Sequence, residues 1–129
     1  MSQTLTKATL AGSGAVLGLA GGAMMFAPGT FLAMSDVFVE PSPGLMSELT
    51  APSGVLLFAG ALMILASVKQ RFVTRGLITG AIIYGSYGTS RLVSMIIYGV
   101  PSNSLITATA IELCVAALLV SCYTVHTDE

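Results

Sequence analysis

The chain has 129 residues, of which 54% are hydrophobic and 9% are charged, whereas a soluble domain carries roughly 25% charged residues. So few charges cannot cover a water-facing surface, and we expect most of the surface to face lipid; the alternative is a small helical domain buried inside a larger assembly. The formal net charge of −1 and the lack of a basic patch argue against nucleic-acid binding.

The first predicted element is an apolar helix over residues 8–27, which contain no charged residue. About 20 apolar residues match the roughly 30 Å hydrocarbon core of a bilayer. A cleaved signal peptide is the alternative, but the apolar run is long for one. Gly14, Gly18 and Gly22 repeat as GxxxG, a spacing that lets helix backbones approach closely. We therefore expect them to pack against another helix, in this chain or in a partner.

Residues 28–46 are predicted to form a mixed loop after Pro28-Gly29 ends the first helix. This loop is apolar enough to lie along the membrane interface or to cap the helices. A second helix is predicted over residues 45–68, with Glu48 near its start. Pro52 marks either the first turn of this helix or a kink.

The third helix is predicted over residues 76–98 and the fourth over residues 104–125. Residues 99–103, Gly-Val-Pro-Ser-Asn, have the composition of a tight turn. Helices joined by short connections favour antiparallel neighbours. The sequence therefore predicts an all-α, membrane-embedded, up-down four-helix bundle that forms a single domain over residues 1–129.

The charges outside the predicted helices are distributed unevenly. The basic ones fall on the side shared by the N-terminus, the connection between the second and third helices, and the C-terminus; acidic ones mark the other side. They are Lys7, Lys69, Arg71 and Arg75 on the first side, and Asp36 and Glu40 on the second. The positive-inside rule then predicts a multi-pass protein with both termini in the cytoplasm.

Two charges, Arg91 and Glu112, lie inside predicted membrane helices. A central arginine costs about 2.5–3.5 kcal/mol on insertion scales, so such residues face the protein interior and pair. In an antiparallel hairpin turning near Pro101, the two charges lie at similar depth. Glu112 is therefore the predicted partner of Arg91, with Glu48 as the alternative.

Polar side chains accompany Arg91 along one face of the third helix, at steps of three and four residues. They are Tyr84, Tyr87, Ser94 and Tyr98. Two interpretations remain open. Either the Arg–Glu pair fixes the register of the helices, with tyrosine hydroxyls satisfying its remaining donors, or the stripe lines a polar pocket for a lipid head group, a small polar molecule or a proton.

No catalytic or metal-binding pattern is found in the sequence. The one histidine, His126, lies in the C-terminal tail, so haem ligation by two histidines of this chain is excluded and a Ser-His-Asp triad lacks an embedded base. Cys114 and Cys122 have neither a CxxC nor a zinc spacing, and they lie about 12 Å apart along a helix. We therefore expect no enzyme activity, no metal site and no cofactor.

Four segments carry a resemblance to a known family. Following Pro28 along the chain, they are residues 47–54 with Glu48, residues 85–94 with Arg91, residues 98–102, and residues 111–113 with Glu112. Together they resemble an uncharacterised family of small bacterial four-helix membrane proteins, described only as a domain of unknown function and similar in architecture to the DoxX-like proteins. The resemblance implies this fold in a bacterial inner membrane but no activity. Where the family typically has an arginine after the glutamate of the second helix, this chain has Thr50.

These observations lead to two functional hypotheses. The first is a non-enzymatic membrane protein with a structural or accessory role, surrounded by lipid and contacting other membrane subunits or a second copy of itself. The second is a small transporter, or a protein that binds a lipid or small molecule, with a pocket formed by Arg91, Glu112, Glu48 and the tyrosines. A cavity lined by these residues supports the second hypothesis, and a dry, fully paired Arg–Glu contact contradicts it.

Overall fold

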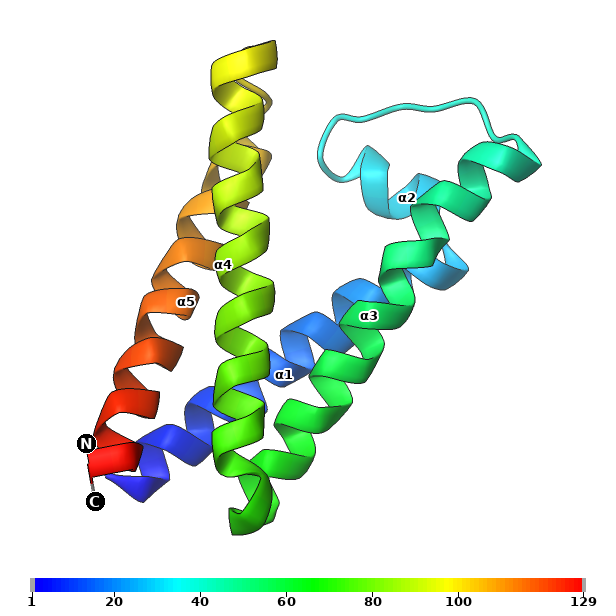
Figure 1. Cartoon of the computed structure of the whole chain (residues 1–129). Helices are drawn as coiled ribbons and strands as arrows, with labels where there is room; N and C mark the ends of the chain where they lie inside the picture. The colour runs from blue at the N-terminus through cyan, green and yellow to red at the C-terminus, as the bar shows by residue number, and fades with distance from the viewer. Residues whose placement is uncertain (1, 129) are drawn as a thin grey trace.

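Four long α-helices and one short one account for most of the chain (Figure 1). The computed structural model describes residues 2–128, and within these residues there is no β-strand. The helices are α1 (Gln3–Phe26), α2 (Pro28–Ala33), α3 (Pro43–Val68), α4 (Val73–Tyr98) and α5 (Asn103–Asp128), and the 3-10 turn η1 (Gln70–Phe72) joins α3 to α4. The predicted all-α fold class is confirmed.

The long helices extend beyond the apolar stretches from which they were predicted, which began at residues 8, 45, 76 and 104. Serine caps set two of the observed starts. The Ser2 hydroxyl oxygen accepts a hydrogen bond from the Leu5 N–H at 3.3 Å, and the Ser42 hydroxyl oxygen accepts one from the Leu45 N–H at 3.2 Å. Because capping satisfies the N–H groups of the first turn, hydropathy locates the middle of a helix better than its ends.

The segment predicted as a loop over residues 28–46 contains the helix α2. Pro28 stands at its start, where a fixed φ and a missing N–H favour helix initiation. The chain turns after α2 at Asp36, whose φ of 59° is in the left-handed region, and has no regular structure from there to Ser42. Sequence periodicity missed α2 because a helix of 6 residues is too short to show it.

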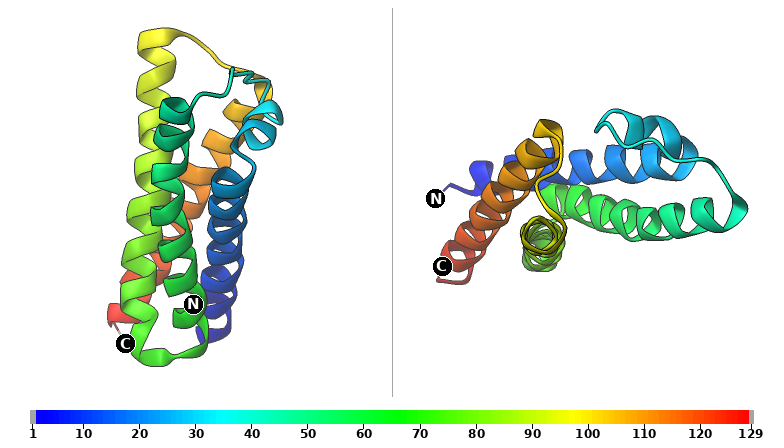
Figure 2. Two further views of the ribbon diagram at one scale, coloured as in Figure 1. Left: turned by 90° about the vertical axis from the view of Figure 1, so that its right-hand side faces the viewer. Right: turned by 90° about the horizontal axis from the view of Figure 1, so that it is seen from above.

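The long helices form two antiparallel pairs, α1 with α3 and α4 with α5 (Figure 1). The pairs meet at the end of the molecule that holds both termini and η1. They diverge toward the other end, where α2 and the connection between α4 and α5 lie (Figures 1 and 2). The helices alternate in direction as predicted, but they form two diverging pairs, and the predicted four-helix bundle is not confirmed.

Glycines bring α1 and α3 into close contact. A Cβ atom on Gly60 of α3 would lie 2.7 Å from the Gly14 carbonyl oxygen and 2.8 Å from the Gly18 nitrogen, both in the backbone of α1. A Cβ atom on Gly18 or on Gly22 would meet no atom within 4 Å, whereas one on Gly21 would lie 3.0 Å from Leu57 of α3. Gly18 therefore meets α3 only through its backbone beside Gly60, and Gly21 faces α3 in place of Gly22. With 3.6 residues per turn, a packing face follows 14, 18 and 21 rather than a strict spacing of four.

Most of the fully buried side chains lie at the end where the two pairs meet, with Ser53 of α3 as an exception. The largest of those at this end come from all four long helices: Leu10, Met63, Leu77, Leu119, Val73 and Cys122. Each of these residues is near the terminus-proximal end of its helix. Side chains therefore fill this end of the molecule, while the diverging end is more loosely packed.

Many large apolar side chains remain exposed on the long helices; Phe58 is 83% exposed and Ile96 is 85% exposed. Within residues 2–128, three helices are long and apolar enough to cross a membrane, judged by length and composition: α1, α3 and α5. The fourth predicted membrane helix, α4, has 26 residues but does not meet this measure. Its glycine, tyrosine, serine, threonine and arginine residues lower its mean hydropathy.

Candidate functional site

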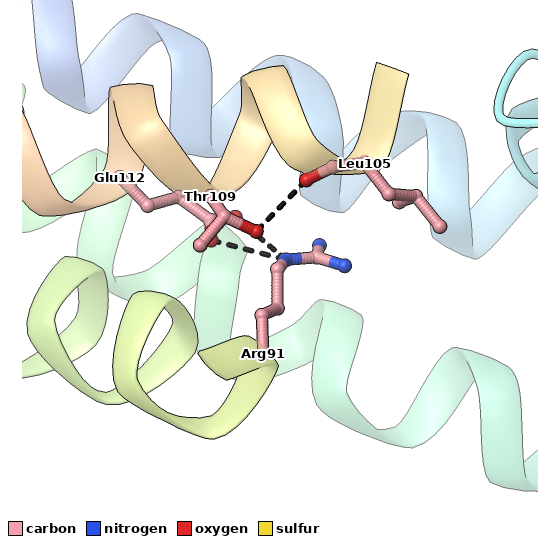
Figure 3. Close-up of polar contacts among 4 residues, drawn as sticks. All are labelled: Arg91, Leu105, Thr109 and Glu112. Atoms are coloured by element: carbon pink, nitrogen blue, oxygen red, sulfur yellow. Dashed lines mark hydrogen bonds and ion pairs between the residues drawn. The ribbon is translucent and has the colours of Figure 1, made fainter. Parts of the chain in front are cut away.

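Arg91 on α4 and Glu112 on α5 form an ion pair (Figure 3). The Arg91 Nε–H donates to both carboxylate oxygens of Glu112, at 3.0 Å to Oε2 and 3.3 Å to Oε1. The antiparallel packing of α4 on α5 brings the two residues to the same level, which is the geometry expected of a hairpin. Glu48, the alternative partner, is exposed near the start of α3 and forms no ion pair with another described residue.

The guanidinium of Arg91 is only partly used by this ion pair. Its two terminal nitrogens point away from Glu112 (Figure 3), and within residues 2–128 they make no hydrogen bond. The side chain of Arg91 is 33% exposed, compared with 16% for Glu112. Since Nε supplies only one of the N–H donors of arginine, the donors of the terminal nitrogens remain available to another group.

A cavity of about 240 Å³ lies beside the ion pair, between the two helix pairs. Arg91 and Glu112 are the only charged residues in its lining, Tyr84 and Tyr87 also reach it, and the remaining lining residues are apolar. A cavity of roughly 150 Å³ is enough to hold benzene. This one therefore has room for a small ligand or one alkyl chain, with mostly apolar walls and a polar group beside it.

The short helix α2 covers the cavity at the diverging end of the molecule. Phe31 of α2 contributes to the lining, and the Ser102 hydroxyl donates a hydrogen bond to the Ser35 carbonyl oxygen at 3.0 Å. This bond joins the loop after α2 to the connection between α4 and α5. Sequence reasoning singled out neither Phe31 nor Ser102 for the site, because a single sequence does not reveal contacts between residues 67 positions apart.

Tyr84 connects the two helix pairs at the wall of the cavity. It is only 4% exposed, and its hydroxyl donates a 2.7 Å hydrogen bond to the backbone carbonyl oxygen of Ser13 on α1. One prediction from the sequence was that tyrosine hydroxyls satisfy the spare donors of Arg91. Tyr84 does not do so, because its hydroxyl is bound to α1.

The predicted polar stripe on α4 is divided between the cavity and the surface. Tyr84, Tyr87 and Arg91 line the cavity. Ser94 lines a second cavity of about 90 Å³, which Arg91 also lines, next to the connection between α4 and α5. Tyr98 is 83% exposed. Helical spacing placed these residues on one face, but the divergence of the pairs leaves the far end of this face without a packing partner.

Replacing Tyr84 by phenylalanine is expected to lower the free energy of unfolding by about 0.5–1.5 kcal/mol, because the hydrogen bond to Ser13 is lost while the ring stays in place. Tyr98→Phe is the matched control, since Tyr98 is 83% exposed. It should change stability by less than about 0.5 kcal/mol. Denaturant titration of the purified protein, followed by circular dichroism, measures both; equal losses would contradict a stabilising role for the Tyr84 hydroxyl.

A family model described as a domain of unknown function (DUF4345) matches residues 5–123. These residues include the whole lining of the larger cavity and both members of the ion pair. No curated protein and no solved structure is significantly similar to the chain. A function must therefore be argued from the geometry of the site.

Proposed function

The chain belongs to the DUF4345 family, and because the function of that family is unknown, we propose one from the geometry of the chain itself. We propose an integral membrane protein that binds a lipid or a small amphiphilic molecule between its two helix pairs. The observation that carries the proposal is the cavity of about 240 Å³, with mostly apolar walls and the Arg91–Glu112 pair in its lining. An amphiphile has the same division into an apolar body and a polar end.

The exposed apolar surface supports a position in the membrane. A soluble monomer rarely exposes apolar patches larger than a few hundred Å², whereas every long helix here exposes large apolar side chains, such as Leu19, Phe58, Ile96 and Ile111. In this proposal α4 crosses the membrane with α1, α3 and α5. Tyr84, Tyr87 and Arg91 of α4 line the cavity, so these polar side chains have a surface inside the protein to face.

The orientation in the membrane follows from the basic residues. They lie in the first turns of α1 and around η1, at the end of the molecule that holds both termini (Figure 1). The acidic residues Asp36 and Glu40 lie in the loop after α2, at the other end. By the positive-inside rule both termini face the cytoplasm, and we place the chain in a bacterial inner membrane with its cavity toward the outer side.

Binding explains the site better than the other hypotheses. A register lock needs a dry, fully paired contact, whereas this ion pair borders a cavity and leaves donors free. Transport needs a route to the cytoplasmic end, which fully buried side chains such as Leu10, Met63 and Leu77 fill. An accessory-subunit role is motivated by composition and the glycine-rich α1, but Gly14 and Gly21 of this helix already pack on α3 within the chain. A catalytic role is not proposed, because both oxygens of Glu112 accept from Arg91.

Filling the cavity tests the proposed function. Ala108 on α5 lines the cavity, whereas Ala110 on the same helix is exposed and does not. We expect Ala108→Phe to lower the amount of lipid or small molecule retained by the protein at least about tenfold, since the ring occupies the space of the ligand. Native mass spectrometry of protein purified from membranes measures this amount.

Ala110→Phe adds the same ring to the surface of α5 and should leave retention unchanged. Equal retention in the two variants would show that no ligand occupies the cavity. A wild-type protein that carries no bound molecule above the level of Ala108→Phe would also contradict the proposal.

A further inference from the structure

The available donors of Arg91 indicate which ligands the cavity accepts. We propose that it takes a single-chain amphiphile whose head group is an anion with at least two oxygens, a carboxylate or a phosphate, and that the terminal nitrogens of Arg91 bind this head group. The inference rests on the proposed binding function and adds the chemistry by which the site selects its ligand.

The geometry of the guanidinium favours such a head group. The terminal nitrogens of arginine form a planar fork whose parallel N–H groups match two oxygens of a carboxylate or phosphate. Here the Nε–H of Arg91 is hydrogen-bonded to Glu112, and the terminal nitrogens point away from Glu112 (Figure 3). Glu112 is therefore a positioning residue, which holds the guanidinium from one side while its other side stays available.

Other head groups fit the site less well. Both oxygens of Glu112 already accept from Arg91, so a cationic head group would compete for them and would lie beside the positive guanidinium, which is unfavourable. A neutral hydroxyl offers the fork a single uncharged oxygen. A carboxylate or phosphate can instead accept two parallel charge-assisted hydrogen bonds from the fork, so an anion is expected to bind best.

The available space sets the shape of the ligand, because Arg91 lines two cavities. The larger one, of about 240 Å³, has mostly apolar walls, and the smaller one, of about 90 Å³, is lined by Ser94 and Arg91 among others. On the scale of roughly 150 Å³ for a benzene ring, the larger cavity holds about ten carbon atoms. This is room for one alkyl chain, while the smaller cavity leaves space for head-group oxygens beside Arg91.

Ligands with one chain and different head groups test the inference. Decanoate, decyl phosphate, 1-decanol and decylamine are each tritiated and bound to the full-length protein in lipid nanodiscs, with empty nanodiscs to correct for partitioning. In the wild-type protein we expect the two anions to bind at least about tenfold more tightly than decanol, and decylamine to bind most weakly. Tighter binding of decanoate identifies a free fatty acid as the source of the head group, and tighter binding of decyl phosphate identifies a phosphate ester.

A double variant without charges at the site tests whether Arg91 causes the preference. Arg91→Gln combined with Glu112→Gln removes the ion pair without leaving one charge alone, so it avoids the folding defect expected of a single substitution. We expect this double variant to bind the four ligands within about threefold of one another, since only the chain is still recognised. Glu48→Gln, which changes an exposed glutamate outside both cavities, should keep the wild-type preference.

The possible failures separate the two proposals. Decanol or decylamine binding as tightly as the anions in the wild-type protein would overturn the inference about the head group. An anion preference that persists in the double variant would overturn the role of Arg91. If none of the four ligands binds above empty nanodiscs, or if Ala108→Phe leaves their binding unchanged, the proposed binding function itself is wrong.

Discussion

Arg91→Leu is expected to lower the free energy of unfolding by about 1–3 kcal/mol, because Glu112 keeps its charge and loses the cation that stabilises it. Breaking a fully buried ion pair costs about 3–5 kcal/mol. This pair is less buried, with 33% of the Arg91 side chain and 16% of the Glu112 side chain exposed, so the remaining charge is not enclosed in a packed protein core and the expected cost is smaller. Glu112→Leu should have a similar effect, since it leaves the guanidinium without its partner.

The double variant Arg91→Leu/Glu112→Leu should lose less stability than the sum of the two single losses. Neither charge remains to be solvated, and neighbouring residues that share a hydrogen bond couple by about 0.5–3 kcal/mol. The measurement is a double-mutant cycle of unfolding in mixed micelles, titrated with a denaturing detergent and followed by helical circular dichroism. Additive losses would show that the two side chains do not stabilise each other.

Glu48 supplies the control for this cycle. It is an exposed glutamate that was the alternative partner of Arg91, and it makes no ion pair within the described residues. Glu48→Leu should therefore change stability by less than about 0.5 kcal/mol, and its effect should add to that of Arg91→Leu. If the coupling energy between residues 48 and 91 is as large as that expected between residues 91 and 112, the ion pair has been assigned to the wrong glutamate.

The sequence was sufficient to predict the four long helices, and it made Glu112 the first candidate partner of Arg91 while leaving Glu48 open. Hydropathy identified four long helices because each has a central apolar stretch, although the serine caps place two starts earlier than predicted. The pairing of Arg91 with Glu112 follows from their distances to the turn between α4 and α5. The resemblance to an uncharacterised family, on segments around Glu48, Arg91 and Glu112, is confirmed by the match over residues 5–123.

A pocket was only one of two interpretations open from the sequence, because the presence of the cavity depends on the angle between the helix pairs. Helical spacing shows that Tyr84, Tyr87, Ser94 and Tyr98 share a face with Arg91, but it does not show how far along α4 another helix packs on that face. The structure buries Tyr84 and leaves Tyr98 exposed. The covering helix α2 has no periodic signal, so its contribution to the site was also missed.

The glycine spacing predicted the packing face of α1 but did not identify the helix or the residue that packs against it. GxxxG on α1 indicated a face that can approach another backbone, and Gly14 and Gly18 do contact α3. Gly60, the residue of α3 that meets them, belongs to no such repeat and was not predicted to be a packing residue. The structure therefore predicts a different pattern of sensitivity to mutation than the motif does.

Gly60→Ala is expected to lower the free energy of unfolding by about 1–3 kcal/mol, although it adds a single methyl group. The added Cβ would lie 2.7 Å from the Gly14 carbonyl oxygen and 2.8 Å from the Gly18 nitrogen. Both are backbone atoms, which cannot rotate away as a side chain can, so α1 and α3 must move apart along their contact. The same detergent titration measures the loss.

Gly18→Ala separates this explanation from the motif. The GxxxG pattern predicts that alanine at residue 18 disrupts packing, whereas in the structure a Cβ at Gly18 meets no atom within 4 Å. Alanine also favours a helix over glycine by about 1 kcal/mol, so Gly18→Ala should leave stability unchanged or raise it. Losses of equal size at residues 18 and 60 would contradict the observed contact between α1 and α3.

The contact between α1 and α3 also affects the cavity. Leu17 of α1 and Leu56 of α3 both line it, so Gly60→Ala, which moves the two helices apart, should also reduce ligand retention, whereas Gly18→Ala should not.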